Sequence, residues 1–146
     1  MSAKGDATAL QVCVRFRPLR KEEEKSGVAW NVMTEYSTIC ETTNAGKPIA
    51  NSGATFDKVY AGDVSTEEVY NDIGSPLVEN AMNGMNATIF AYGQTSSGKT
   101  FTMQGDGTKT GSKTGFINMA AQQIFKHIED HPDREFLLRL SYIEIY

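Results

Sequence analysis

The sequence predicts an α/β fold in which helices cover a layered sheet. Apolar and polar residues alternate over Leu10–Arg17 and Glu135–Tyr146, which is the period of half-buried strands. Apolar residues recur at helical spacing over 65–82 and 117–129. A glycine-rich loop follows an apolar run in the middle of the chain. Strands and helices that alternate along a chain are typical of this layer architecture.

Composition limits the classes of protein that fit. The chain has 146 residues, of which 40% are hydrophobic and 22% charged, with a net charge of −4. This is ordinary globular composition, with enough residues for one domain and a core. The acidic balance disfavours a nucleic-acid partner, and no apolar stretch approaches the ~20 residues of a membrane span. We therefore expect a cytoplasmic protein without nucleic-acid or membrane partners. Residues 1–9 are small and polar and predict a flexible tail without signal-peptide features.

The first part of the chain predicts strands and a small hairpin sheet. Leu10–Arg17 is the first strand, and Pro18 ends it because proline cannot donate to a sheet ladder. The charge run Lys21–Lys25 indicates a surface loop or frayed turn. Short β-like pieces within 28–50 predict an exposed hairpin outside the main core. Ala54–Tyr60 predicts one further strand.

Two helices follow from apolar periodicity and capping. Ser65 or Thr66 caps a helix that continues to about Met82, in which Pro76 should produce a kink or local break. A second helix is predicted over Ile117–Glu129, where the apolar residues share one face. Between these helices, the sequence predicts a buried strand and the glycine-rich loop.

The glycine-rich loop predicts binding of a nucleoside triphosphate. It follows the predicted strand Ala87–Tyr92 and matches the pattern Gly-x4-Gly-Lys-Ser/Thr. Glycines let the backbone curl around an anion, and the helix that follows points its positive end at the same place. Lys99 should reach the β- and γ-phosphates, and the Thr100 hydroxyl should bind Mg²⁺. The phosphate-binding residues are Gly93, Gln94, Thr95, Ser96, Ser97, Gly98, Lys99 and Thr100. A chance match should occur less than about once in a hundred chains of this length.

The cysteines and histidines give weaker signals. Cys13 and Cys40 lack metal-ligand spacing, and Cys13 fits a small buried strand residue. His127 and His131 are four residues apart, which could place two metal ligands on one helix face. The helix should end near residue 129 and no third ligand is near in sequence. A surface pair is therefore the favoured interpretation.

Together these segments resemble the kinesin motor domain over about residues 10–146. The resemblance is strongest at the strand and phosphate loop, which match the kinesin signature residue by residue and are more specific than a phosphate loop alone. One short segment, 132–139, is most similar to the centromere-associated (CENP-E type) branch. The matching segments are Val14–Leu19, Phe56–Tyr60, Thr88–Met103 and Leu140–Tyr146.

The resemblance implies further nucleotide contacts and names the cofactor as ATP or ADP with Mg²⁺. It extends the site to Phe101 and implies that adenine is framed by Arg15, Arg17, Pro18 and Tyr70. Guanidinium groups stack on bases, and proline and tyrosine offer flat apolar faces. Without the resemblance, the two arginines would be interpreted as strand-surface charge. The insertion at 104–115 corresponds to a variable loop beside the nucleotide and should be mobile.

Kinesin motor domains are more than twice as long as this chain. We therefore expect residues 10–146 to be the N-terminal part of the motor fold, truncated before the switch regions that sense the γ-phosphate and position water. No complete catalytic set is expected here. Two central strands would also be missing, which would leave apolar sheet edges exposed.

The resemblance implies that the longer protein hydrolyses ATP to move along microtubules, with a role in chromosome movement during mitosis. It would bind tubulin and dimerise through a coiled coil, both outside this chain. Its location would be the cytoskeleton, at the spindle or kinetochore. The alternative is a non-hydrolysing nucleotide-binding module or inactive fragment. A small phosphate-loop kinase is disfavoured because residues 104–115 carry only Lys109 and Lys113 as lid cations.

Overall fold

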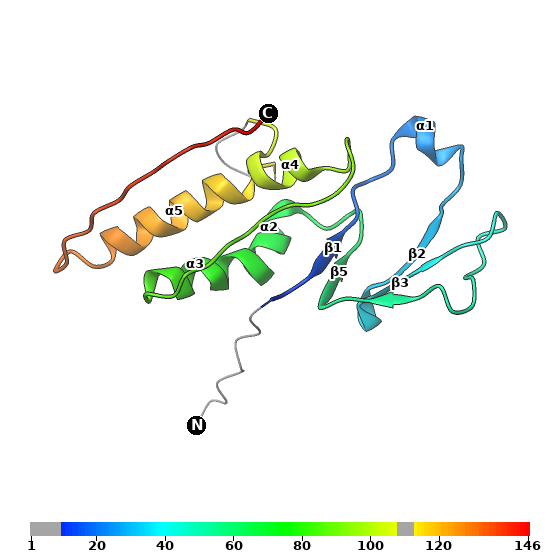
Figure 1. Ribbon diagram of the computed structural model, residues 1–146, viewed down its shortest axis with the longest axis horizontal. Coiled ribbons are helices and arrows are strands. Elements are labelled where there is room, and N and C mark those ends of the chain that lie inside the picture. Colours follow the sequence, from blue (N-terminus) through cyan, green and yellow to red (C-terminus); the bar gives the residue numbers. More distant parts are fainter. Residues whose placement is uncertain (1–9, 108–112) are drawn as a thin grey trace, which may run out of the picture. The chain divides into compact units, whose positions relative to one another are not determined.

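The computed structural model describes residues 10–107 and 113–146 (Figure 1). The predicted flexible tail over 1–9 and part of the predicted mobile loop over 104–115 lie outside these residues. The chain divides into two compact units, Met1–Val64 and Ser65–Tyr146. Each unit is described by itself.

In the first unit, the first strand of the chain pairs in parallel with a later strand. Strand β1 (Cys13–Arg15) pairs with β5 (Lys58–Tyr60), with Val14 opposite Val59. Backbone bonds from Asp57 N to Val12 O (3.0 Å) and from Phe16 N to Tyr60 O (2.9 Å) extend the contact at both ends. The paired region is therefore shorter than the predicted 10–17 but lies within it.

A three-stranded antiparallel sheet confirms the predicted hairpin. Strands β2 (Trp30–Met33) and β3 (Thr38–Glu41) are joined by the 3-10 turn η1 (Thr34–Tyr36). Strand β4 (Ala54–Thr55) pairs with β3 on its other side. The single strand predicted over 54–60 is wrong, because its first two residues join this sheet and its last three join β1. The predicted loop at 21–25 forms one exposed helical turn, α1 (Lys21–Glu24).

The second unit begins with a helical segment of three consecutive parts. These are α2 (Thr66–Val69), the π-helical turn η2 (Tyr70–Gly74) and α3 (Ser75–Met82). Ser65 caps the segment, since its Oγ accepts from Glu68 N at 3.1 Å. Pro76 lies in the first turn of α3, directly after the wider π turn, so the predicted local break is confirmed. The π turn accommodates a residue that cannot donate to a carbonyl in the preceding turn.

Helices α4 (Lys99–Gln104) and α5 (Phe116–Glu129) complete this unit. Val69, Tyr70, Val78 and Phe116 are buried and form the core beneath α5. Gly105 and Thr114 form an isolated antiparallel β-bridge, which brings the backbone after α4 against the backbone before α5. A Cβ on Gly115 would lie 2.3 Å from the Gln104 carbonyl carbon, so this close approach of the two backbone segments requires glycine at position 115.

Two predicted strands do not pair in the described part of the chain. The segments 87–92 and 135–146 are extended but belong to neither sheet (Figure 1). Tyr92 is 95% exposed, which contradicts the buried strand expected before the phosphate loop, and in the other segment Leu140 is 97% exposed. The alternation of side chains encodes an extended backbone, but a strand also needs a neighbour for its N–H and C=O groups. The described residues place none beside these segments.

Candidate phosphate-binding site

The phosphate loop curls through backbone conformations that favour glycine. It connects the extended segment 87–92 to α4, and Gly98 (φ 103°) immediately precedes the helix. Gly93 also has a positive φ, and a Cβ there would lie 2.6 Å from Ser97 Oγ. Ser97 N donates to Gln94 O at 3.2 Å, which closes a turn within the loop. The glycines of the motif therefore stand where the backbone requires them.

The Lys99 side chain folds back across this loop. Its ammonium donates to Gly93 O at 2.7 Å and to Gln94 O at 2.8 Å. Both partners are backbone carbonyls, so neither neutralises the positive charge. The ammonium therefore lies against the curled backbone with its charge available to an anion.

Thr100 lies in the first turn of α4 and is exposed. A threonine hydroxyl next to the loop lysine is suited to Mg²⁺ that is also held by phosphate oxygens and water. Within the described ranges, no group of three or more His, Cys, Asp or Glu side chains gathers as a metal site. A single hydroxyl donor such as that of Thr100 fits a metal that arrives with its phosphate ligands.

The histidine pair predicted at the end of the second helix forms a local contact. The His127 and His131 rings stack with centroids 4.2 Å apart. His131 Nδ1 lies 2.8 Å from His127 O, where a protonated Nδ1 would cap the helix end.

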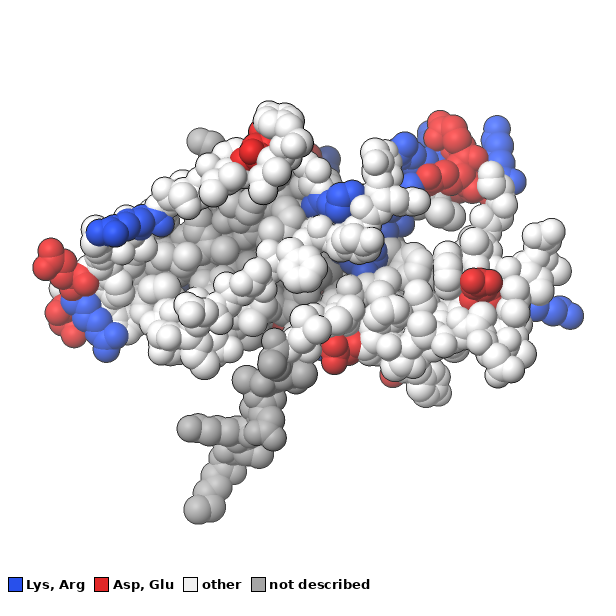
Figure 2. Space-filling view, in the orientation of Figure 1, with Lys and Arg blue, Asp and Glu red and all other residues white. Residues whose placement is uncertain are grey.

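Arg15 and Arg17 lie in the first unit and have different surroundings. Arg15 is partly buried and its Nη2 donates to Val64 O at 3.4 Å; burial lowers its pKa. Both terminal nitrogens of the Arg17 guanidinium donate to the Glu23 carboxylate, at 2.7 and 2.5 Å. This contact, together with a bond from Arg20 N, lowers the Glu23 pKa to about 2. Basic and acidic side chains lie together around α1 in Figure 2.

Tyr70 lies in the core of the second unit. Tyr70 is only 4% exposed, and burial raises the pKa of its hydroxyl. Its ring packs edge-to-face with the ring of Phe116, with centroids 5.3 Å apart. Its hydroxyl donates to Gln123 Oε1 at 2.5 Å, and Gln123 Nε2 donates to Ser75 O at 3.1 Å. In this arrangement the ring has no open face for a base. Phe101, in contrast, is 41% exposed and lies two residues after Lys99.

The structure therefore groups the predicted site residues unevenly. The loop residues from Gly93 to Phe101 are contiguous and belong to the second unit. Arg15, Arg17 and Pro18 belong to the first unit. Sequence reasoning missed Glu23, because a run of glutamates gives no sign of which one meets an arginine. It also missed Gln123, whose partner Tyr70 is 53 residues away.

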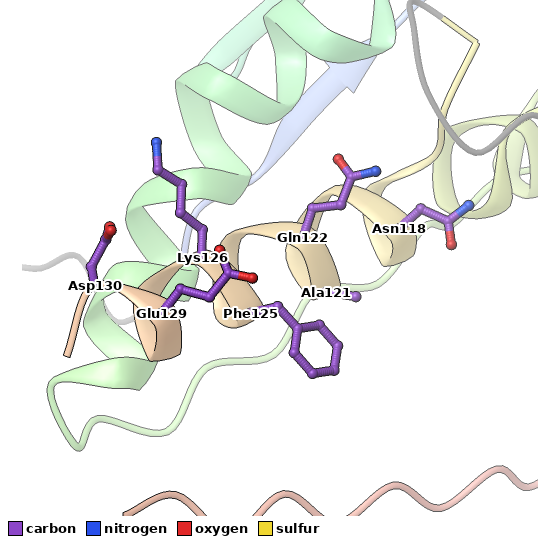
Figure 3. Close-up of a pocket in the computed structure, with 7 residues that line it drawn as sticks. All are labelled: Asn118, Ala121, Gln122, Phe125, Lys126, Glu129 and Asp130. Atoms are coloured by element: carbon purple, nitrogen blue, oxygen red, sulfur yellow. The ribbon is translucent and has the colours of Figure 1, made fainter. Parts of the chain in front are cut away.

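A hollow of about 600 Å³ lies along α5. Figure 3 shows its lining side chains spread along the helix rather than pointing at one centre. Ligand sites usually have a few convergent polar groups, which this surface lacks. The lining residues are Asn118, Ala121, Gln122, Phe125, Lys126, Glu129 and Asp130.

Comparison with known proteins shows similarity to one family. A family model described as the kinesin motor domain matches residues 15–146. Human Centromere-associated protein E is 43% identical over 142 residues, which cover 94% of this chain and 5% of that protein. Rice (Oryza sativa subsp. japonica) Kinesin-like protein KIN-7K, chloroplastic, is 42% identical over 147 residues, covering 99% and 13% respectively. Kinesin-related protein 4 of Dictyostelium discoideum is 39% identical over 140 residues, covering 94% and 7%.

The chain thus spans a small part of the length of these relatives. Among residues 10–107 and 113–146, no helix combines the length and apolar character needed to cross a bilayer.

Proposed function

This chain belongs to the kinesin motor-domain family, and on that premise we propose that its phosphate loop binds ATP or ADP with Mg²⁺ as part of a microtubule motor. One observation carries the proposal. The Lys99 ammonium lies on the curled loop, held by two uncharged backbone carbonyls. A triphosphate would replace these dipoles with negative charge, which strengthens the hydrogen bonds to the ammonium.

Each part of the loop has a role in this proposal. The backbone from Gly93 to Gly98 cradles the phosphates, Lys99 contacts the β- and γ-phosphates, and Thr100 holds Mg²⁺. When bound, the metal neutralises charge on the phosphates. Phe101 offers an exposed aromatic face for the base.

The resemblance to kinesins also implies base contacts from Arg15, Arg17 and Pro18, which belong to the first unit. These residues offer guanidinium planes and a flat ring for stacking on adenine. The burial of Tyr70 argues against its direct contact with adenine. Its bond to Gln123 instead supports a role in holding the helix segment against α5.

For the longer protein, we propose ATP hydrolysis coupled to movement along microtubules. Residues 10–146 would form the N-terminal part of its motor domain, with the switch regions and tubulin contacts supplied from outside this chain. It would act on the cytoskeleton as a coiled-coil dimer. A mitotic role at the spindle or kinetochore is supported by the name of the human relative, whereas the rice relative is named chloroplastic.

The first test is a titration of the purified protein with a fluorescent ATP analogue, in Mg²⁺ and in EDTA. We expect binding to be tighter with Mg²⁺ and the Thr100→Ala variant to lose most of that difference. Thr88→Ala, an exposed threonine upstream of the loop, serves as the matched control. Equal binding in Mg²⁺ and EDTA would contradict the role of Thr100.

Phosphate release distinguishes the motor from a non-hydrolysing module. Turnover stimulated by microtubules would support the motor. Tight binding without turnover would leave the nucleotide site in place but contradict hydrolysis by the protein tested.

A further inference from the structure

We propose that Gly115 is a positioning residue of the phosphate site. Its close backbone contact with the end of α4 sets where this helix lies, and so where Lys99 and Thr100 meet the phosphates and Mg²⁺. The inference rests on the proposed function, in which these two side chains bind the nucleotide. All three residues belong to the second unit. Gly115 itself would touch neither the nucleotide nor the metal.

Helix α4 is too short to hold its own position. It spans six residues, and Lys99 and Thr100 occupy its first two positions. A helix of this length is marginal without support from tertiary contacts. None of its residues is buried, so burial of its own side chains gives little of that support. The position of α4 therefore depends on the backbone contacts made at its two ends.

The end of α4 lies directly against the backbone that leads into α5. A Cβ on Gly115 would lie 2.3 Å from the Gln104 carbonyl carbon and 2.4 Å from Met103 O. Both are main-chain atoms of α4, which cannot move aside as the end of a flexible side chain can. Gly115 itself has φ −89° and ψ 168°, an extended conformation open to any residue. The contact, and not the conformation, therefore requires glycine at this position.

A short backbone bridge keeps the two segments at this distance. Gly105 pairs with Thr114, and Asp106 N donates to Lys113 O at 3.1 Å. The Lys113 ammonium also lies 3.7 Å from the Asp106 carboxylate. On the α5 side, Thr114 is 2% exposed and Phe116 is 3% exposed. The end of α4 is thus joined to a part of the chain that is fixed in the core of the unit.

Helical hydrogen bonds connect the end of α4 with its functional first turn. Thr102 N donates to Gly98 O at 2.9 Å, and Gly105 N donates to Phe101 O at 2.9 Å. A helix of so few residues therefore moves as one body when its end is displaced. Hydrogen bonds and metal coordination depend steeply on distance, and a misplacement of about 1 Å can cost about 100-fold in activity. A methyl group at Gly115 should consequently weaken phosphate binding.

The experiment compares Gly115→Ala with Gly74→Ala as the matched control. Gly74 belongs to η2 in the same unit, and a Cβ there would lie 2.6 Å from the Tyr70 ring. Both substitutions add one methyl group at a crowded position, so both should lower the thermal unfolding temperature. Only Gly115→Ala places that group against α4.

The readout is displacement of a fluorescent ATP analogue by inorganic tripolyphosphate with Mg²⁺. Tripolyphosphate carries the phosphates without the base, so the result does not depend on any contact with adenine. We expect Gly115→Ala to weaken tripolyphosphate binding about tenfold or more and Gly74→Ala to leave it unchanged. In the Lys99→Ala background, Gly115→Ala should cause a smaller loss, because the contact that it misplaces is already absent.

Hydrogen exchange of the wild-type protein tests the same coupling without a substitution, which keeps the proposal testable if Gly115→Ala does not fold. If the position of α4 links the bridge to the phosphates, bound Mg²⁺ and tripolyphosphate should slow exchange of the Asp106 amide, which donates to Lys113 O. The Asn83 amide, which donates to Glu79 O at the end of α3, should not respond.

The outcomes separate this inference from the proposed function. If the wild-type protein binds neither ATP nor tripolyphosphate, the proposed function fails, and the role of Gly115 fails with it. If the wild type binds both, equal tripolyphosphate affinities of Gly115→Ala and Gly74→Ala would overturn only the role of Gly115. Exchange at Asp106 that does not change with the ligand would overturn it as well.

Discussion

Lys99 in the phosphate loop and Arg17, which lies between β1 and α1, are two cations with different kinds of hydrogen-bond partner. Lys99 donates to the carbonyls of Gly93 and Gln94, whereas Arg17 donates to a carboxylate. The carbonyls leave the ammonium charge in place, and the carboxylate neutralises the guanidinium. The difference teaches that the partner of a cation, as well as its residue type, decides how much of its charge remains available to a ligand.

The largest expected effect comes from removing the loop cation. Lys99→Ala should weaken ATP binding about 10- to 100-fold, because hydrogen bonds to charged groups contribute about 1.5–3 kcal/mol. The measurement is a titration with the fluorescent ATP analogue. Lys126→Ala, a lysine on α5, should leave the affinity unchanged. Equal losses in the two variants would indicate a general charge effect rather than a phosphate contact.

The next effect tests the backbone of the loop. Gly98 has a φ of 103°, so Gly98→Ala should introduce about 1–2 kcal/mol of strain and reduce ATP affinity. Gly84 follows α3 with a φ of 91° and open space around it, so Gly84→Ala carries similar strain outside the loop. Both variants should lose thermal stability, and Gly98→Ala alone should lose affinity. Unchanged binding by Gly98→Ala would argue against a conformation required by the ligand.

The paired cation can be tested through its carboxylate. NMR titration should give Glu23 a pKa of about 2, below the ordinary value of 4.5. Because folding lowers this pKa, the associated stability is present above pH 4.5 and is lost as the pH falls through about 2.

Arg17→Gln should return the Glu23 pKa toward its ordinary range. The pKa of Glu68, which hydrogen bonds to Ser65 lower, should stay unchanged and serves as the control. If the pKa of Glu23 does not change in Arg17→Gln, contacts other than that with Arg17 lower it.

The smallest expected effect distinguishes the buried aromatic residue from the exposed one. Tyr70→Phe removes the hydroxyl bond to Gln123 and should lower the free energy of unfolding by about 1 kcal/mol, measured in urea. ATP affinity should not change in this variant. Phe101→Leu should do the reverse, with a lower ATP affinity and little loss of stability, because Phe101 is 41% exposed. A loss of ATP affinity in Tyr70→Phe would indicate that Tyr70 contributes to nucleotide binding.

Features encoded by neighbouring residues could be predicted from the sequence. The helix cap at Ser65, the break near Pro76 and the hairpin of β2 and β3 all depend on residues close in sequence. The curl of the phosphate loop also follows from local glycine placement. The division of residues 54–60 between two sheets depends on distant partners, Ile39 for Ala54 and Val14 for Val59, and could not be predicted.

By itself, the sequence determined the phosphate-loop pattern, the helix cap at Ser65 and the extended backbone of segments 87–92 and 135–146. The tertiary structure alone decided which extended segments became strands, because ladder hydrogen bonds need a neighbour that periodicity does not specify. It also decided that Tyr70 is buried and that Glu23, among three consecutive glutamates, holds Arg17. Local patterns set backbone conformation, whereas the partner of each side chain depends on contacts between residues far apart along the chain.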